Sequence, residues 1–537
     1  MEPQLINNMN NQSDLIASDS EPENDVIDSE KVTLINPKTN KAYPKPVKQY
    51  PSPPPYEQTP SFQYLDKIIE SLTFSRYHLA TLCVCAFSIM CGGFVSSHFI
   101  FSKNLLIVNY TWTLTTYSCV FIFQNLIGAI GAFISVTSTT NEWDIHSNVL
   151  IGLIGLLSVV LMTFYNEGPL YIILIFMFNY CQGFINNICC NFLLEEFKLK
   201  YRELAFVFVS SFRLIGCGLF GLSAYIVYDK YENDDPIINI WVLAILQLCL
   251  TLSLCFFYDS PRLLYYNASE QDVFKYIQAS TDPLDNVGKY KETICKRIKE
   301  TQREIRKTLP SQKYSNLFLH FTQLWQGPYL VLSLKAVIFV FLSCFLMSNI
   351  KDSYSYFFHD KSKYLFIISD ENAPHYRIPV YYLCVFIGVL VICALKYFLN
   401  MGRKLLCLIC LVGCFVFLIL MIFFNKHFIY FLGAFETLAV FYHIMVYMYF
   451  STYITTQLRN SMTSLLYITL TVSMIFQSVL LNSMANYTLF GYLNFGVVII
   501  LVLLEMFLID EDTKDLQLQQ IEIKLLRAMN TSINKEK

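Results

Sequence analysis

The sequence predicts an all-α polytopic membrane protein, with twelve transmembrane helices in two six-helix halves and a cytoplasmic helical central loop. Hydrophobic residues make up 54% of the 537 residues and charged residues 15%, against about 25% charged residues in a soluble domain. Apolar stretches recur at the length of about twenty residues that crosses a bilayer. They are continuously apolar rather than alternating, which excludes a β-barrel and leaves helices.

The first segment, residues 1–75, is expected to be a disordered cytoplasmic tail. It is rich in Asn, Ser, Glu and Pro, and it cannot bury enough apolar area to order itself. Pro53, Pro54 and Tyr56 fit the PPxY pattern, which binds the grooves of WW domains as a polyproline II helix. A WW-domain ubiquitin ligase is therefore a candidate partner, and a featureless linker is the alternative.

The twelve spans fall into two groups of six, separated by a hydrophilic stretch at 259–327. The spans are expected at 77–101, 112–137, 147–165, 169–194, 204–228, 237–258, 328–350, 379–399, 404–424, 427–450, 460–481 and 488–509. This spacing predicts an N-terminal bundle at 76–258, a central loop at 259–327, a C-terminal bundle at 328–510 and a cytoplasmic tail at 511–537.

The central loop is expected to be helical, because apolar residues recur at a helical period from Val287 to Leu309 and Pro310 ends the run. Lysines and arginines are concentrated in this loop and the N-terminal tail, which favours cytoplasmic termini. The short loops alone contain equal numbers of lysines and arginines on the two sides of the membrane, so they favour neither orientation. The expected location is the plasma membrane or an intracellular vesicle membrane.

Several function classes are excluded by composition and motifs. The formal net charge of −2 gives no bulk attraction to nucleic acid. Most of the 17 cysteines lie in apolar runs, where a thiol acts as a small apolar side chain. We find no phosphate loop, catalytic triad or metal-ligand cluster, so we expect neither an enzyme nor a cofactor or metal. The expected partners are the lipid bilayer and a small-molecule or ion substrate.

Three motifs occur in an order that resembles the major facilitator superfamily. The DSPR segment Asp259–Arg262 follows the sixth span, Glu195 precedes Arg202 by seven residues after the fourth, and Gly402–Lys404 reads GRK after the eighth. The second half repeats the Glu-x6-Arg spacing at Thr452 and Arg459, without the carboxylate. The nearest resemblance is to the sugar-porter, organic-ion and synaptic vesicle glycoprotein 2-like branch.

The resemblance implies the major facilitator fold and transport by alternating access. It implies gating roles for Glu195, Arg202, Arg262, Gly402, Arg403, Lys404 and Arg459. The loop between the second and third spans lacks the family's Gly-Arg-Arg motif, and the paired glutamines of sugar porters are absent from the fifth span. A transport-inactive, transporter-like protein that acts in binding or vesicle trafficking is therefore the alternative function.

Polar residues within the spans are the candidates for substrate binding, because such groups are costly in lipid. The candidates are Asn179, Gln182 and Asn186 in the fourth span, Arg213 in the fifth, and Glu436, His443 and Tyr447 in the tenth. We expect Arg213 either to face Glu436 across the two halves or to receive an anionic group of the substrate. Glu436 or His443 would then take up a proton. The alternatives are a permanent buried ion pair and, for the amides, bonds between helices.

Overall fold

The computed structural model describes residues 34–35, 42–43, 76–101, 106–107, 111–140, 145–165, 168–197, 199–230, 237–256, 271, 274, 295–296, 299, 317–359, 377–399, 401–424, 428–454, 456–483 and 487–509. The PPxY motif, Arg262 and the C-terminal tail lie outside these residues. The chain divides into two units, Met1–Gln58 and Thr59–Lys537. In the first unit, strand β1 (Leu34–Ile35) pairs antiparallel with β2 (Ala42–Tyr43).

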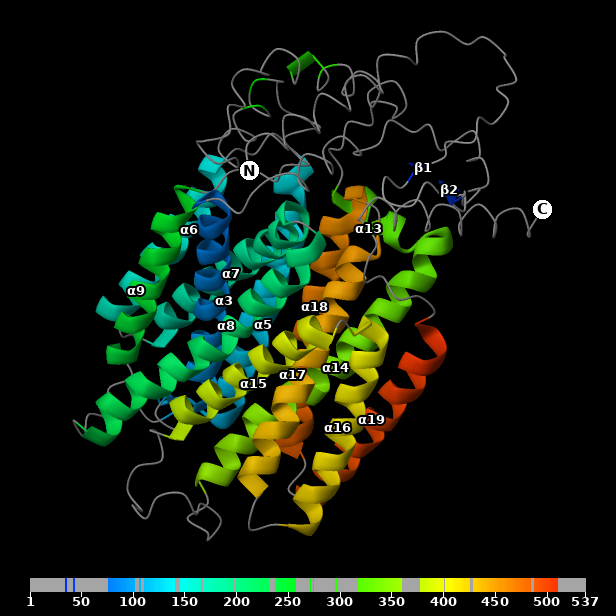
Figure 1. The fold of residues 1–537 in the computed structure, drawn as a ribbon. Helices are drawn as coiled ribbons and strands as arrows, with labels where there is room; N and C mark the ends of the chain where they lie inside the picture. Colours follow the sequence, from blue (N-terminus) through cyan, green and yellow to red (C-terminus); the bar gives the residue numbers. More distant parts are fainter. Residues whose placement is uncertain are drawn as a thin grey trace. The chain divides into compact units, whose positions relative to one another are not determined.

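The second unit contains twelve long helices within the described residues, and these coincide with the expected spans (Figure 1). In the first half they are α3 (Arg76–Phe101), α5 (Leu114–Thr140), α6 (Ile145–Phe164), α7 (Gly168–Glu196), α8 (Leu199–Ala224) and α9 (Ile237–Leu254). In the second half they are α14 (Gly327–His359), α15 (Arg377–Leu399), α16 (Arg403–Phe423), α17 (Phe428–Thr452), α18 (Thr456–Ser483) and α19 (Tyr487–Leu508). The predicted twelve-helix, all-α membrane fold is confirmed.

The helices differ from the expected spans mainly at their ends. A short helix, α13 (Leu317–Leu324), precedes α14, which itself continues to His359. Helix α8 begins at Leu199 and continues past Ala224 as a π-helical turn, η2 (Tyr225–Lys230). Hydropathy marks the apolar part of a helix, whereas the backbone stays helical beyond the hydrocarbon layer, so a helix can be longer than its apolar segment.

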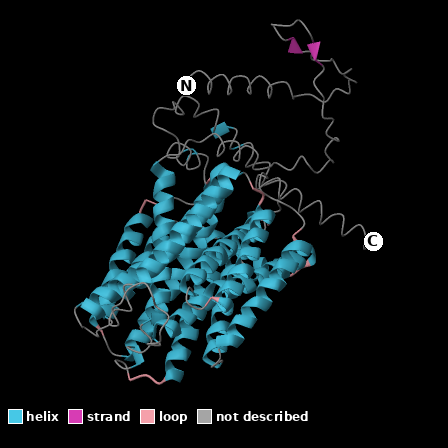
Figure 2. Ribbon diagram, turned by 60° about the horizontal axis from the view of Figure 1, so that its bottom comes forward, coloured by secondary structure: helices cyan, strands magenta, loops and turns pink. Residues whose placement is uncertain are grey.

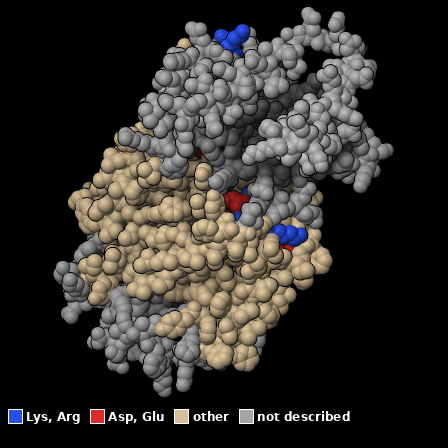
Figure 3. All heavy atoms as spheres, in the orientation of Figure 1, with Lys and Arg blue, Asp and Glu red and all other residues tan. Residues whose placement is uncertain are grey.

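Nine of the described helices are long and apolar enough to cross a membrane by length and composition. Asn239–Leu254 and Leu493–Leu508 are shorter apolar segments of α9 and α19. Helix α18 is as long as the others but more polar, and its buried side chains include Ser461, Thr463, Ser464, Thr469, Thr471 and Ser473. The outer faces of the helices expose large apolar side chains, such as Phe398 and Phe507. Figure 3 shows few charged residues on the described surface of the bundle, as a protein in contact with lipid requires.

Two helix crossings in the first half bring backbones into direct contact. A Cβ atom on Gly183 of α7 would overlap the carbonyl oxygen of Gly128 on α5, and a Cβ atom on Gly93 of α3 would overlap that of Arg213 on α8. Glycine allows such close approach between helices in a membrane. The α3–α8 crossing therefore fixes the backbone of Arg213 against the core of the first half.

The two halves meet mainly through two helix pairs, α8 with α15 and α5 with α18. Figures 1 and 2 show the long helices side by side in one bundle. Helix α7 also contacts α18, and helix α17 also contacts α8, so both pairs join the two halves. This arrangement places α3, α5, α7, α8, α14, α15, α17 and α18 around the interface between the halves.

Candidate functional site

A cavity of about 170 Å³ lies between the two halves. Its walls come from α3, α5, α7 and α8 of the first half and from α14, α17 and α18 of the second. All seven residues that the sequence suggested for substrate binding line it: Asn179, Gln182, Asn186, Arg213, Glu436, His443 and Tyr447. The structure thus brings them together, while their role in binding remains a prediction.

Glu436 is held by a neighbour in its own half. Its side chain is fully buried on α17, and its Oε2 atom accepts a hydrogen bond from the hydroxyl of Tyr381 on α15 at 2.5 Å. The ion pair between Arg213 and Glu436 that the sequence suggested is not formed in this structure. The reason is that a nearby tyrosine hydroxyl offers the carboxylate a donor, which no hydropathy pattern reveals.

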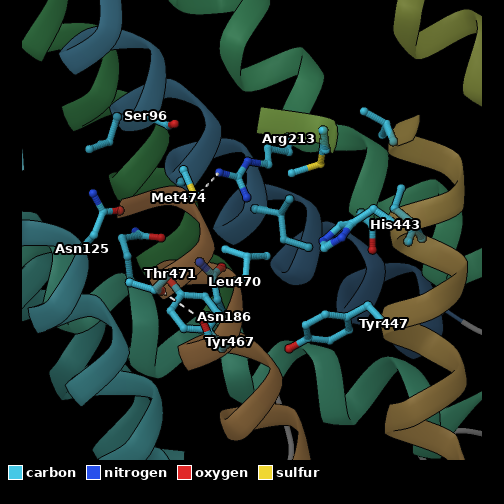
Figure 4. A pocket seen from close by; sticks show the side chains of 18 of the residues that line it. Ser96, Asn125, Asn186, Arg213, His443, Tyr447, Tyr467, Leu470, Thr471 and Met474 are labelled. Atoms are coloured by element: carbon cyan, nitrogen blue, oxygen red, sulfur yellow. Dashed lines mark hydrogen bonds between the residues drawn. The ribbon is translucent and has the colours of Figure 1, made fainter. Parts of the chain in front are cut away.

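Arg213 lies half-buried on α8, with its guanidinium beside Met474 of α18 (Figure 4). Its Nη2 atom donates to the Met474 sulfur at 3.8 Å, a weak acceptor. Its Nε atom is buried without a hydrogen-bond partner, and Arg213 forms no ion pair with any described residue. The second alternative, that Arg213 receives an anionic group, remains open.

His443 and Tyr447 lie one turn apart on α17 and are both buried. The His443 Nδ1 atom and the Ser343 hydroxyl on α14 are 2.9 Å apart. The Tyr447 hydroxyl donates to the Thr463 carbonyl on α18 at 3.0 Å. In Figure 4 both side chains point toward the cavity from α17. These bonds fix both side chains to neighbouring helices of the second half.

The three candidate amides of α7 make hydrogen bonds within the first half, and that of Asn179 is to Ile175 of its own helix. Gln182 donates through Nε2 to Gln247 of α9 at 2.8 Å. Asn186 accepts from the Ser88 hydroxyl of α3 at 2.5 Å, and it lies beside Tyr467 of α18 in Figure 4. Gln182 and Asn186 therefore both join helices and line the cavity, so the two interpretations of this stripe are compatible.

Beyond the cavity, toward the end where α7 ends at Glu196 and α8 begins at Leu199 (the α7/α8 end), neutral amides join the halves. Asn460 of α18 accepts hydrogen bonds from Asn187 at 2.9 Å and from Asn191 at 2.5 Å. Thr463 of α18 donates to the Asn191 side-chain oxygen at 3.2 Å. Contacts from α7 to α18 thus close the interface next to the cavity.

Ion pairs between the halves continue this closure at the α7/α8 end. Arg459 of α18 donates to Glu195 of α7 at 2.8 Å, and their side chains are 1% and 9% exposed. Lys396 of α15 and Arg403 of α16 both pair with Glu203 of α8. Arg459, whose own half lacks the matching carboxylate, therefore uses the carboxylate of the other half.

The remaining gating candidates have local contacts. Arg202 donates to the Phe197 carbonyl at 3.3 Å, and Lys404 donates to the Ile509 carbonyl at the end of α19. Gly402 is the N-cap of α16, with φ −64° and ψ 150°, an extended conformation open to any residue. Its backbone therefore does not require glycine.

Several residues of the site were not predicted from the sequence. Glu203 is the acidic partner of the α15–α16 turn, and Tyr467 and Thr471 line the cavity from α18. The polar composition of α18 was the available signal for the last two. Glu203 directly precedes the expected fifth span, so hydropathy assigns it to a loop. In the structure it lies in the first turns of α8.

Comparison with known proteins identifies the fold. Residues 82–478 match the family model described as Major Facilitator Superfamily. The structure of the proton:xylose symporter XylE bound to 6-bromo-6-deoxy-D-glucose is 13% identical, with 84% of this chain and 99% of that chain covered and a TM-score of 0.62. The xylose transporter XylE from E. coli in a partially occluded inward open conformation is 12% identical, with coverage of 81% and 100% and a TM-score of 0.58. No curated protein matches the sequence significantly.

Proposed function

Because the chain belongs to the major facilitator superfamily, we propose that it is a secondary active or facilitative transporter that moves a small organic solute or ion by alternating access. The observation that supports this most directly is the cavity between the halves, which both halves line. Transporters of this kind bind their substrate between two bundles that rock about it. The chain is accordingly an integral multi-pass membrane protein rather than an enzyme.

The contacts at the α7/α8 end indicate which state the structure represents. The pairs Glu195–Arg459 and Glu203–Arg403 both join one half to the other, so the interface is closed at this end. With the expected cytoplasmic termini, this is the cytoplasmic side. Exchange to the opposite state requires these pairs to separate and their charges to be solvated again, as expected for contacts that exist in only one of two states.

Within the superfamily, we place the chain in the sugar-porter, organic-ion and synaptic vesicle glycoprotein 2-like branch. The DSPR segment Asp259–Arg262 after the sixth span and the pairing of Glu195 support this placement. The plasma membrane or a vesicle membrane is the proposed location. The PPxY motif at Pro53, Pro54 and Tyr56 would recruit a WW-domain ubiquitin ligase to the N-terminal tail.

The proposal is tested by distances between spin labels on the full-length protein in lipid nanodiscs. Labels at Tyr201 on α8 and Tyr453 after α17 report the α7/α8 end, and labels at Thr113 and Tyr430 report the opposite end. All four side chains lie on the described part of the bundle and none is buried. Non-canonical amino acids carry the labels, so that the native cysteines remain.

Alternating access predicts that each pair of labels shows two distances. When the short distance becomes more populated at one end, the long distance should become more populated at the other end. A control pair within the first half, at Thr113 and Tyr165, should show one unchanged distance, because a bundle moves as a rigid body. A single distance at both ends, under every condition that leaves the protein folded, would contradict transport. It would favour the transport-inactive alternative.

A further inference from the structure

Five buried cavity atoms have no hydrogen bond to a described residue, and all of them except Glu436 Oε1 lie on the wall of the first half. Ser96 Oγ on α3, Gln124 Oε1 on α5, Gln182 Oε1 on α7 and Arg213 Nε on α8 are buried atoms without a hydrogen-bond partner. All four residues line the cavity. Buried polar atoms are nearly always satisfied in native proteins. Four such residues around one cavity therefore indicate a position where a ligand supplies the partners.

Arg213 distinguishes this wall further, because no described residue forms an ion pair with it. Two other inner arginines, Arg459 and Arg403, each pair with a carboxylate of the opposite half. Arg213 has only the sulfur of Met474 as an acceptor. A cation in a membrane interior is costly unless it is paired or hydrated. A carboxylate is the group that a guanidinium binds best, through two parallel charge-assisted hydrogen bonds.

Apolar side chains line both walls, and the wall of the second half differs mainly in how its polar groups are bonded. Its apolar part consists of Met347, Val440, Ile444, Leu470 and Met474. Methionine side chains adapt to irregular apolar shapes. Among the polar groups on the same side, the Oε2 atom of Glu436, the Nδ1 atom of His443 and the Tyr447 hydroxyl are bonded to Tyr381, Ser343 and Thr463. This side is therefore suited to the apolar portion of a solute.

We propose that the cavity binds a small organic monoanion, with its carboxylate on Arg213 of the first half and its apolar portion against the second half. A hydroxyl next to the carboxylate would donate to the Oε1 atom of Gln124. A second negative charge on the solute would be disfavoured by Glu436, which lines the same cavity. This inference rests on the proposed transport function and specifies its substrate class.

The experiment measures thermal unfolding of the purified full-length protein with butyrate, 2-hydroxyisovalerate and phenyllactate. Each acid is compared with its primary amide at the same concentration. A ligand that binds only the folded state raises the unfolding midpoint as its concentration rises. We expect the carboxylates to raise the midpoint and the amides to leave it unchanged, because an amide cannot neutralise Arg213.

Variants then assign the binding to the first half. Arg213→Gln should weaken carboxylate binding by about tenfold or more, and Arg213→Lys should retain an intermediate affinity. Gln124→Leu should weaken binding of the two hydroxy acids and leave butyrate unchanged. Lys335→Gln is the matched control, because the Lys335 ammonium contacts the Leu508 carbonyl at 2.9 Å, away from the cavity. It should bind like the unmodified chain.

The inference is overturned if no carboxylate raises the midpoint, if the amides raise it equally, or if Arg213→Gln binds as tightly as the unmodified chain. If that variant does not fold, equal affinities of Arg213→Lys and the unmodified chain, together with unchanged binding by Gln124→Leu, overturn it. The spin-label distances keep this outcome separate from transport. If the labels show two distances but no carboxylate binds, the transport proposal remains intact. If a carboxylate binds but the labels show a single distance, only the transport proposal is contradicted.

Discussion

Removing Arg459 should shift the protein toward the state that is open at the α7/α8 end. In the closed state Arg459 and Glu195 are 2.8 Å apart and almost fully buried. Arg459→Gln leaves the Glu195 carboxylate buried without its cation, and breaking a buried pair in this way costs about 3–5 kcal/mol. In the open state the carboxylate can be hydrated, so the cost applies to the closed state only.

At 1.4 kcal/mol for each factor of ten, this cost lowers the ratio of closed to open molecules by roughly two to three and a half powers of ten. The assay is the distance distribution between labels at Tyr201 and Tyr453. We expect the short distance to lose most of its population in Arg459→Gln. The distance between Thr113 and Tyr430 should change in the opposite direction.

Two controls isolate the effect of the unpaired charge. The double variant Glu195→Gln with Arg459→Met removes both charges, and it should recover much of the closed population because an apolar replacement of a buried pair is often neutral or stabilising. Lys335→Gln removes a cation whose hydrogen bond among the described residues is to a carbonyl of its own half, and it should leave both distances unchanged. An unaltered short distance in folded Arg459→Gln would refute the reasoning.

Three further predictions follow from single contacts. Gly183→Ala forces a methyl group against the backbone of α5 and should destabilise the protein by roughly 1–3 kcal/mol. Gly496→Ala in α19, with nothing within 4 Å, should not lower the unfolding midpoint and should raise it slightly, because alanine favours the helix. Tyr381→Phe removes the donor to Glu436 and should cost about 1–3 kcal/mol in the unfolding free energy; an unchanged midpoint would show that the bond contributes nothing. Tyr56→Ala in the full-length chain should abolish capture by an isolated WW domain, and equal capture would remove the motif from consideration.

The positions of the helices could be predicted from the sequence because each span must remain apolar over the thickness of the hydrocarbon layer. The seven substrate-binding candidates, all of which line the cavity, could be predicted for the same reason. Arg213 and Glu436 stand out in apolar spans because a charge there is costly. The sequence alone therefore predicts the positions of the helices and the most conspicuous polar residues that they enclose.

Their pairing could not be predicted in the same way. Glu195 and Arg459 are distant in the chain, and no periodicity indicates that the carboxylate of one half neutralises the arginine of the other. Glu436 was expected opposite Arg213, but the Tyr381 hydroxyl lies closer and binds it. Such choices depend on helix rotation and side-chain geometry, which hydropathy does not encode.

The pairing of Arg459 with Glu195 has a consequence for biosynthesis. Translation produces the carboxylate long before the arginine, so Glu195 cannot form this pair until the eleventh helix is made. Expressed separately, each bundle would contain only one member of this buried pair. The two bundles are therefore expected to mature together rather than as independent folding units, and fragments supplied in trans should be degraded unless they assemble.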